Sequence, residues 1–281
     1  KASVLFSPRV GFRWFIDKER KSVLRGGAGL FTGRIPFVWL SNAYNNTGME
    51  TKSVTVSGTA AQSIPTTSDP YTDIILTGAA SAGGKATINT LNENFKYPQV
   101  FRVNLATDIN FGAGWQATLE ALYSKTLNDL YVQDIAFDYT GGKFTAVPGN
   151  SASSAPIYKK ITSYSDVIYM TNTNKGYTYS LTAQIKKSFA WGLSLDAAYT
   201  FGHSYTMYDG TSSVAYSNWK YNYARDTNAP ELAVSGFDIP HRIMASANYN
   251  KSYGKNNRWA THASLIYEGR AGQPYSLTYY F

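Results

Sequence analysis

The most constraining feature of this sequence is a strict two-residue alternation of side chains on both sides of a short turn. Odd positions in 177–185 are apolar or aromatic and even positions are polar, and the alternation resumes over 193–201 after Ala190-Trp191-Gly192. A period of two is typical of β-strands that have one apolar and one polar face. Each arm has about ten residues, the length that a tilted strand needs to cross a bilayer.

Aromatic side chains lie at the ends of this apolar face. They are Tyr177, Tyr179, Phe189, Trp191, Tyr199 and Phe201. Transmembrane barrels carry aromatic girdles at the two membrane interfaces. The segment therefore predicts a transmembrane β-hairpin with lipid outside and water inside. An amphipathic hairpin of a soluble β-sandwich is the alternative, and a single hairpin would favour it.

The same alternation occurs in three further pairs of segments. Their strands are expected at 5–16 with 23–31, 101–109 with 115–123, and 243–249 with 259–267. Short turns join the strands within each pair, whereas long connections at 32–96, 126–175 and 204–236 join one pair to the next. Outer-membrane barrels have short periplasmic turns and long extracellular loops in this order. The sequence therefore predicts an all-β fold, an antiparallel transmembrane β-barrel section in which residues 1–281 belong to one barrel domain.

The composition agrees with a barrel and excludes several other classes. The mean hydropathy is −0.29 and no apolar run approaches the length of a transmembrane helix. The 23 Tyr, 14 Phe and 6 Trp suit aromatic girdles and outer loops. Absence of cysteine excludes disulfides and thiolate metal sites. The net charge of +8 comes from scattered Lys and Arg without a basic stripe, so no nucleic-acid partner is expected.

No catalytic constellation is present in the sequence. His203, His241 and His262 do not have metal-ligand spacing, and no Gly-x-Ser-x-Gly nucleophile elbow occurs. We therefore expect no catalytic residue, no metal and no cofactor, and we expect that the chain is not an enzyme.

Two groups of residues are candidates for contact with a ligand or with a plug. The first shares the polar face of the strands and comprises Arg102, Glu120, Asp196, Arg242, His262 and Glu268. It either contacts a plug or passing substrate, or pairs its charges across strands in a hydrated interior. The second lies in the third long connection and comprises Tyr208, Tyr216, Trp219 and Tyr221. These rings either stack on a sugar or apolar ligand, or continue the girdle into a folded loop.

Strand direction and side-chain size both predict an open sheet. If the short turns are periplasmic, the first strand starts and the eighth strand ends on the extracellular side. Eight strands close only a narrow barrel that side chains must fill. The inward positions are mostly small, namely Ser180, Thr182, Ser194, Ala198, Ser246 and Ser264. We therefore expect eight strands cut from a larger barrel, with the first and eighth strands unpaired. A closed eight-stranded barrel is the alternative.

Several local features are also predicted. The side chains expected to face lipid are Leu105, Leu119, Leu181, Leu195 and Ala245. Gly26, Gly27 and Gly29 are expected where the wall bends or another backbone packs closely. In the second long connection, residues 131–139 followed by Thr140-Gly141-Gly142-Lys143 predict a protruding hairpin. In the first, residues 53–56 and 71–76 resemble short strands.

Four stretches carry a resemblance to a known family. They are RGGAGLFTG at 25–33, NFKYPQVFR at 94–102, NKGY at 174–177 and FDIPHR at 237–242. On these residues the chain resembles the Oar-like TonB-dependent receptors of Bacteroidota. The resemblance implies a section of a 22-stranded outer-membrane barrel whose lumen holds a plug. The family's plug domain, TonB-contacting segment and closing strands have no counterpart in residues 1–281.

The resemblance implies uptake of a nutrient too large for porins, driven from the inner membrane through TonB. The implied partners are outer-membrane lipid, the protein's own plug domain and TonB, and a surface lipoprotein is a further candidate. The alternative function is a structural, assembly or adhesion barrel that acts through its surface loops.

Overall fold

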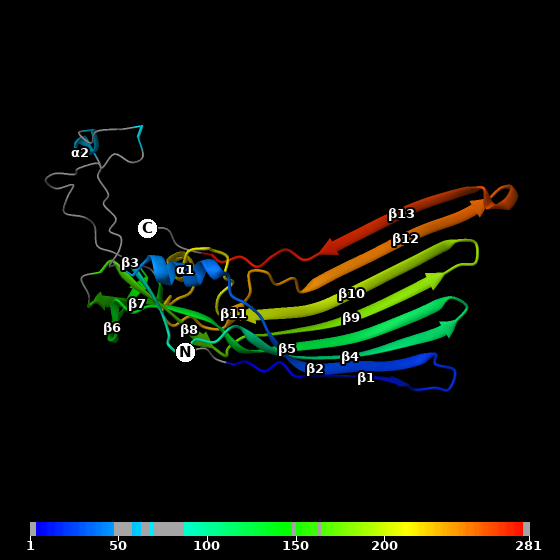
Figure 1. Cartoon of the computed structure of the whole chain (residues 1–281), viewed down its shortest axis with the longest axis horizontal. Helices are drawn as coiled ribbons and strands as arrows, with labels where there is room; N and C mark the ends of the chain where they lie inside the picture. The colour runs from blue at the N-terminus through cyan, green and yellow to red at the C-terminus, as the bar shows by residue number, and fades with distance from the viewer. Residues whose placement is uncertain are drawn as a thin grey trace.

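The computed structural model describes residues 4–47, 58–62, 68–69, 87–147, 150–161 and 164–277. Its main feature is a long antiparallel sheet with the strand order β1-β2-β4-β5-β9-β10-β12-β13 (Figure 1). The strands are β1 (Arg9–Phe15), β2 (Ser22–Thr32), β4 (Gln99–Gly112), β5 (Trp115–Asp134), β9 (Tyr177–Ser188), β10 (Leu193–Thr206), β12 (His241–Tyr253) and β13 (Trp259–Arg270). All eight expected strands are present. Each is hydrogen-bonded to the strand before it and the strand after it in this order.

The sheet is open. β1 and β13 form its two edges, and no pairing between them occurs in the described part of the chain. The expectation of an unpaired first and eighth strand is confirmed, and the closed eight-stranded barrel is wrong. β1 starts and β13 ends at the same end of the sheet, where the long connections lie (Figure 1).

Strand pairing places the predicted lipid-facing residues on one side, here called the apolar face. Leu105 is paired with Ala121, and Ala121 is paired with Leu181 on the next strand. Directly paired residues share a face, and so do residues two apart on one strand. Leu105, Leu119, Leu181, Leu195 and Ala245 all lie on this face, as expected, and contact of the face with lipid stays a prediction.

Two aromatic belts border the apolar face. At the loop end, Tyr177 stacks on Tyr205 with ring centroids 4.8 Å apart. At the short-turn end, Trp191 lies 5.5 Å from Phe189, measured between ring centroids. Amphipathic rings at two depths along the strands match the girdles of a transmembrane barrel.

Close backbone approach requires glycine at Gly26 in β2 and at Gly192 in a short turn. A Cβ added to Gly26 would lie 2.8 Å from the carbonyl oxygen of Asn104, and the ring of Phe12 packs directly above it. Gly192 has a φ of +103°, and a Cβ there would lie 2.0 Å from the carbonyl oxygen of Asn250. The close packing expected at the β2 glycines is confirmed at Gly26.

The buried core lies outside the sheet wall, in a compact body here called the loop lobe. The lobe combines α1 (Phe37–Asn45), β3 (Thr87–Leu91), the end of β5, β8 (Asp166–Thr173) and α3 (Ala215–Lys220) (Figure 1). Its buried apolar side chains are Ile35, Trp39, Leu130, Val132, Ile168, Met170 and Ala215. Burial of one large apolar side chain is worth about 1.5–3 kcal/mol, so this cluster holds three long connections together.

The loop lobe differs from the expected loops in two respects. β5 continues beyond the wall to Asp134 because β8 pairs with it antiparallel over residues 129–134, and β3 then adds to β8 in parallel. The hairpin expected in the second long connection is present as β6 (Phe137–Val147) paired with β7 (Asn150–Lys160), but residues 140–143 lie within β6 and not between its two strands. Residues 53–56 and 71–76 lie outside the described residues.

The remaining elements are short: α2 (Thr59–Gln62), β11 (Ala233–Val234) and a 3₁₀ turn at Lys255–Asn257. None of the helices in the described part of the chain has the length and apolar character needed to cross a membrane.

Candidate functional site

A pocket of about 1090 Å³, here called the loop-end pocket, lies where the third long connection folds back on itself. The end of β10, α3, β11 and the segment that follows β13 contribute its walls. Its aromatic and charged lining residues are Tyr208, Asp209, Tyr221, Tyr223, Arg225, Asp226, Glu231 and Tyr275. The volume is slightly above the usual range of small-molecule sites, and the lining mixes rings with hydrogen-bonding groups.

Hydrogen bonds to the loop lobe and within the third long connection hold the pocket in shape. The hydroxyl of Tyr208 donates to the carbonyl oxygen of Val132 at 2.6 Å. The carboxylate of Asp209 accepts from the hydroxyl of Ser235 at 2.7 Å and from the backbone N–H of Gly236 at 3.0 Å. The pocket therefore depends on the lobe for its geometry.

Asn228 is the buried link between this connection and the end of β5. Its side-chain oxygen accepts from the backbone N–H of Asp134 at 2.8 Å and from the indole N–H of Trp219 at 2.7 Å. Its backbone carbonyl accepts from Tyr131 and Gln133, at 2.8 and 3.1 Å. A buried amide with these partners specifies one docking arrangement, because any other would leave polar groups unpaired.

Carboxylates outnumber cations in the pocket lining. Asp226 accepts hydrogen bonds from the hydroxyl of Tyr158 and from the backbone N–H of Asn228, the latter at 2.9 Å. Burial and the neighbouring Asp226 charge raise the pKa of Tyr158 to about 12. Burial also raises the pKa of Tyr131. Both phenols therefore stay neutral at physiological pH and act as hydrogen-bond donors.

The four aromatic residues proposed from the sequence separate into two pairs. Tyr208 and Tyr221 line the pocket, and 62 % of Tyr221 is exposed. Tyr216 and Trp219 do not line it but pack against the core of the loop lobe. For these two, the alternative of a folded loop describes the structure better than a stacking site.

Sequence reasoning missed part of the pocket. Tyr223 and Arg225 line the pocket together with Tyr275, which lies in the segment that follows β13 in the chain. The run of residues 221–226, in which tyrosines precede a charged pair, was a signal for the first two. Nothing local marked Tyr275, because only the fold brings it to this connection.

A second candidate surface is the polar face of the sheet, where charges pair across strands. Arg25 lies 2.8 Å from Asp108 and 3.4 Å from Glu120, measured between guanidinium nitrogens and carboxylate oxygens. Lys186 and Asp196 are 3.2 Å apart. Each of these groups is part-exposed, so each pair contributes at most about 1 kcal/mol.

The other predicted members of this row also have partners on the polar face. Arg242 lies 3.0 Å from Glu268. The Nδ1 atom of His262 is hydrogen-bonded to Asn250, and the guanidinium of Arg102 lies 5.6 Å from the ring centroid of Phe31. The geometry therefore matches the alternative of charges that pair across strands. Contact of this row with a plug stays a prediction.

No metal-binding constellation is found among the residues that the structure describes, since no three His, Asp or Glu side chains gather there. The loop-end pocket can therefore bind a ligand by ring stacking, hydrogen bonds and carboxylate contacts, and the polar face can line a hydrated passage.

Comparisons with known proteins place these features in context. The family described as "Outer membrane beta barrel domain" matches residues 2–279. The sequence matches none of the curated proteins with which it was compared.

Two solved structures are similar to the chain. The siderophore receptor PirA from Pseudomonas aeruginosa matches with a TM-score of 0.41 and 12 % identity, over 94 % of this chain and 33 % of PirA. The outer membrane transporter YddB from Escherichia coli matches with a TM-score of 0.48 and 11 % identity, over 94 % of this chain and 33 % of YddB. The chain thus spans about a third of the length of each.

Proposed function

Since this chain belongs to the family of outer membrane beta barrel domains, we propose that it forms part of the wall of an energised transporter. Its location is the bacterial outer membrane. The proposed cargo is a nutrient too large for porins, and the proposed partners are a plug domain and TonB. The finer assignment to Oar-like receptors of Bacteroidota is part of this proposal, on the stretches described above.

The observation that supports the proposal is the character of the polar face. Small side chains such as Ser180, Ser194 and Ser264 alternate with paired charges, and the sheet edges stay unpaired. Small residues leave a narrow lumen underpacked, which costs dispersion contacts. A wide barrel that holds water and a plug has no such penalty, and transport needs that lumen.

The absence of cysteine in the chain permits a direct test. Ser194→Cys and Leu195→Cys are adjacent substitutions on opposite faces near the short turns. Each is made in the full-length protein in a cysteine-free background, and intact cells are treated with a membrane-impermeant maleimide. We expect Ser194→Cys to be labelled in energised cells and much less after an uncoupler, because energy is needed to displace the plug. Leu195→Cys should stay unlabelled in both conditions.

Labelling of Ser194→Cys that is unchanged by the uncoupler would contradict energised transport and leave a passive or structural barrel. One observation favours the second candidate, an assembly or adhesion barrel. The loop lobe has a buried core of its own, in which Trp39, Ile168 and Met170 are nearly inaccessible, and such a body can present a binding surface. An adhesion role predicts that cells lose surface binding when β6 and β7 are removed, with maleimide labelling independent of energy.

A further inference from the structure

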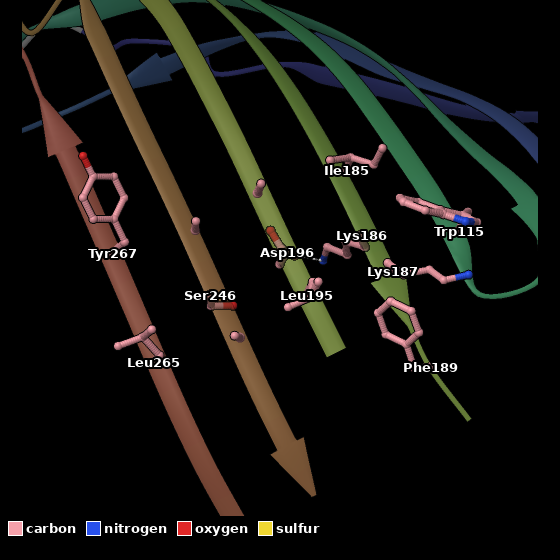
Figure 2. A pocket seen from close by; sticks show the side chains of 13 residues that line it. Trp115, Ile185, Lys186, Lys187, Phe189, Leu195, Asp196, Ser246, Leu265 and Tyr267 are labelled. Atoms are coloured by element: carbon pink, nitrogen blue, oxygen red, sulfur yellow. Dashed lines mark ion pairs between the residues drawn. The ribbon is translucent and has the colours of Figure 1, made fainter. Parts of the chain in front are cut away.

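The apolar face carries a groove of about 430 Å³ across β9, β10, β12 and β13 (Figure 2). Its floor consists of the small residues Ala197, Ala245 and Ala247. One wall carries Ile185 and Trp115, and the other carries Leu265 and Tyr267 (Figure 2). Leu195, Lys187 and Phe189 line the short-turn end of the groove. Lys186, Asp196 and Ser246 also belong to the lining, although strand alternation turns their side chains toward the polar face.

The groove follows from the register of the strands. Ala197 is paired with Ala245, and Ala245 is paired with Tyr267. Two methyl side chains therefore lie side by side between larger side chains, and the surface is lower there. An extended hydrocarbon chain fits such a depression, because each contact within van der Waals distance adds dispersion energy.

The short-turn end of the groove carries a lysine. The ammonium of Lys187 lies 4.8 Å from the ring centroid of Trp115 and 5.2 Å from that of Phe189. It donates to the carbonyl oxygen of Ala113 at 2.6 Å. An ammonium has three donors, so two remain for another acceptor. No carboxylate pairs with Lys187 in the part of the chain that the structure describes.

The segments around the short turns on either side of the groove carry no acidic residue. Residues 250–260, which comprise the end of β12, the turn and the start of β13, contain Lys251, Lys255 and Arg258 and no acidic residue. Residues 111–116, which comprise the end of β4, the turn and the start of β5, contain no charge. Basic residues at a membrane surface attract anionic lipid headgroups. Aromatic rings beside the ammonium mark the depth at which headgroups lie.

We propose that the groove binds one anionic phospholipid of the leaflet on the short-turn side. Its acyl chain lies on Ala197, Ala245 and Ala247, and its phosphate accepts hydrogen bonds from Lys187. The inference depends on the membrane location of the chain and not on the proposed transport.

The test uses the full-length protein in vesicles of zwitterionic phospholipid. A trace of phosphatidylglycerol or of phosphatidylcholine is added, each with a photoactivatable acyl chain, and labelled peptides are identified by mass spectrometry. We expect the phosphatidylglycerol probe to label the strands of the groove about fivefold more than the phosphatidylcholine probe, the preference that one lysine near a membrane surface provides. Lys187→Gln should remove this ratio and Lys187→Arg should keep it.

A second pair of variants tests the floor. Ala197→Phe fills the groove and should lower labelling there by both probes. Ala183→Phe is the matched control, because Ala183 is exposed on the same face of β9 and does not line the groove. Heat-modifiable migration in detergent gels confirms folding of each variant. Equal labelling by both probes, or an unchanged ratio in Lys187→Gln, would each overturn the proposal.

Discussion

Replacement of Leu119 by arginine provides the sharpest test of which face of the sheet meets lipid. Leu119 lies midway along the wall on β5, paired with Thr107 and Ala183, and 56 % of its surface is exposed. In the membrane that exposed part contacts lipid. The apolar face has no carboxylate among the described strand residues, so an arginine there finds no ion-pair partner.

The expected cost follows from the depth of this position. Trp115 and Tyr123 mark the two aromatic belts on β5, each four residues from Leu119. Four residues correspond to about 13 Å along a strand, or to about 10 Å in depth when the strand tilts by about 40°. A guanidinium at Leu119 therefore reaches neither interface without distortion. We expect Leu119→Arg to lower the free energy of unfolding by about 2–4 kcal/mol.

Leu122→Arg is the matched control, because Leu122 lies on the same strand but on the polar face. Its paired neighbours are Asn104 and Ser180, which leave room and water for a cation. We expect a cost below about 1 kcal/mol for this variant. Urea unfolding in phospholipid vesicles, followed by tryptophan fluorescence, measures both values. Equal costs, or a larger cost for Leu122→Arg, would refute the assignment of the faces.

Three further predictions concern the loop lobe and the turns. Asn228→Ala leaves the backbone N–H of Asp134 and the indole N–H of Trp219 without an acceptor. Hydrogen exchange should therefore report that the lobe loses about 2–5 kcal/mol of stability. Asn45→Ala, at an exposed site, is the control and should change the lobe stability little. Gly192→Ala places an alanine at a φ of +103° against the carbonyl oxygen of Asn250, and should lower the free energy of unfolding in vesicles by about 1–3 kcal/mol. An unchanged urea midpoint of unfolding would contradict the turn geometry. Burial raises the pKa of Asp129, so the folded lobe binds the proton more tightly, and lobe stability should fall as pH rises from about 3.9 to that raised value. Asp129→Asn should flatten this dependence in pH-resolved hydrogen exchange, and a persisting slope would assign it to another group.

The sequence by itself determined the strands of the wall and their two faces. Successive side chains of a strand point to opposite faces, so the face of each residue depends only on whether its number is odd or even, here called its parity. The alternation at 177–201 was therefore sufficient to place Leu181 and Leu195 on the apolar face. Alternating connection lengths were sufficient for the order of the hairpins. Small residues at positions such as Ser194 predicted an open sheet, because they cannot fill a narrow lumen.

Only the tertiary structure decided what the long connections do. Asp134 is hydrogen-bonded to Asn228, which is 94 residues away, and β5 extends past the wall because β8 docks on it. The packing of Tyr216 and Trp219 against the lobe core was decided in the same way, since it depends on the docked lobe. Parity is a local property of the backbone, whereas the docking of connections depends on contacts between distant residues that no short pattern records.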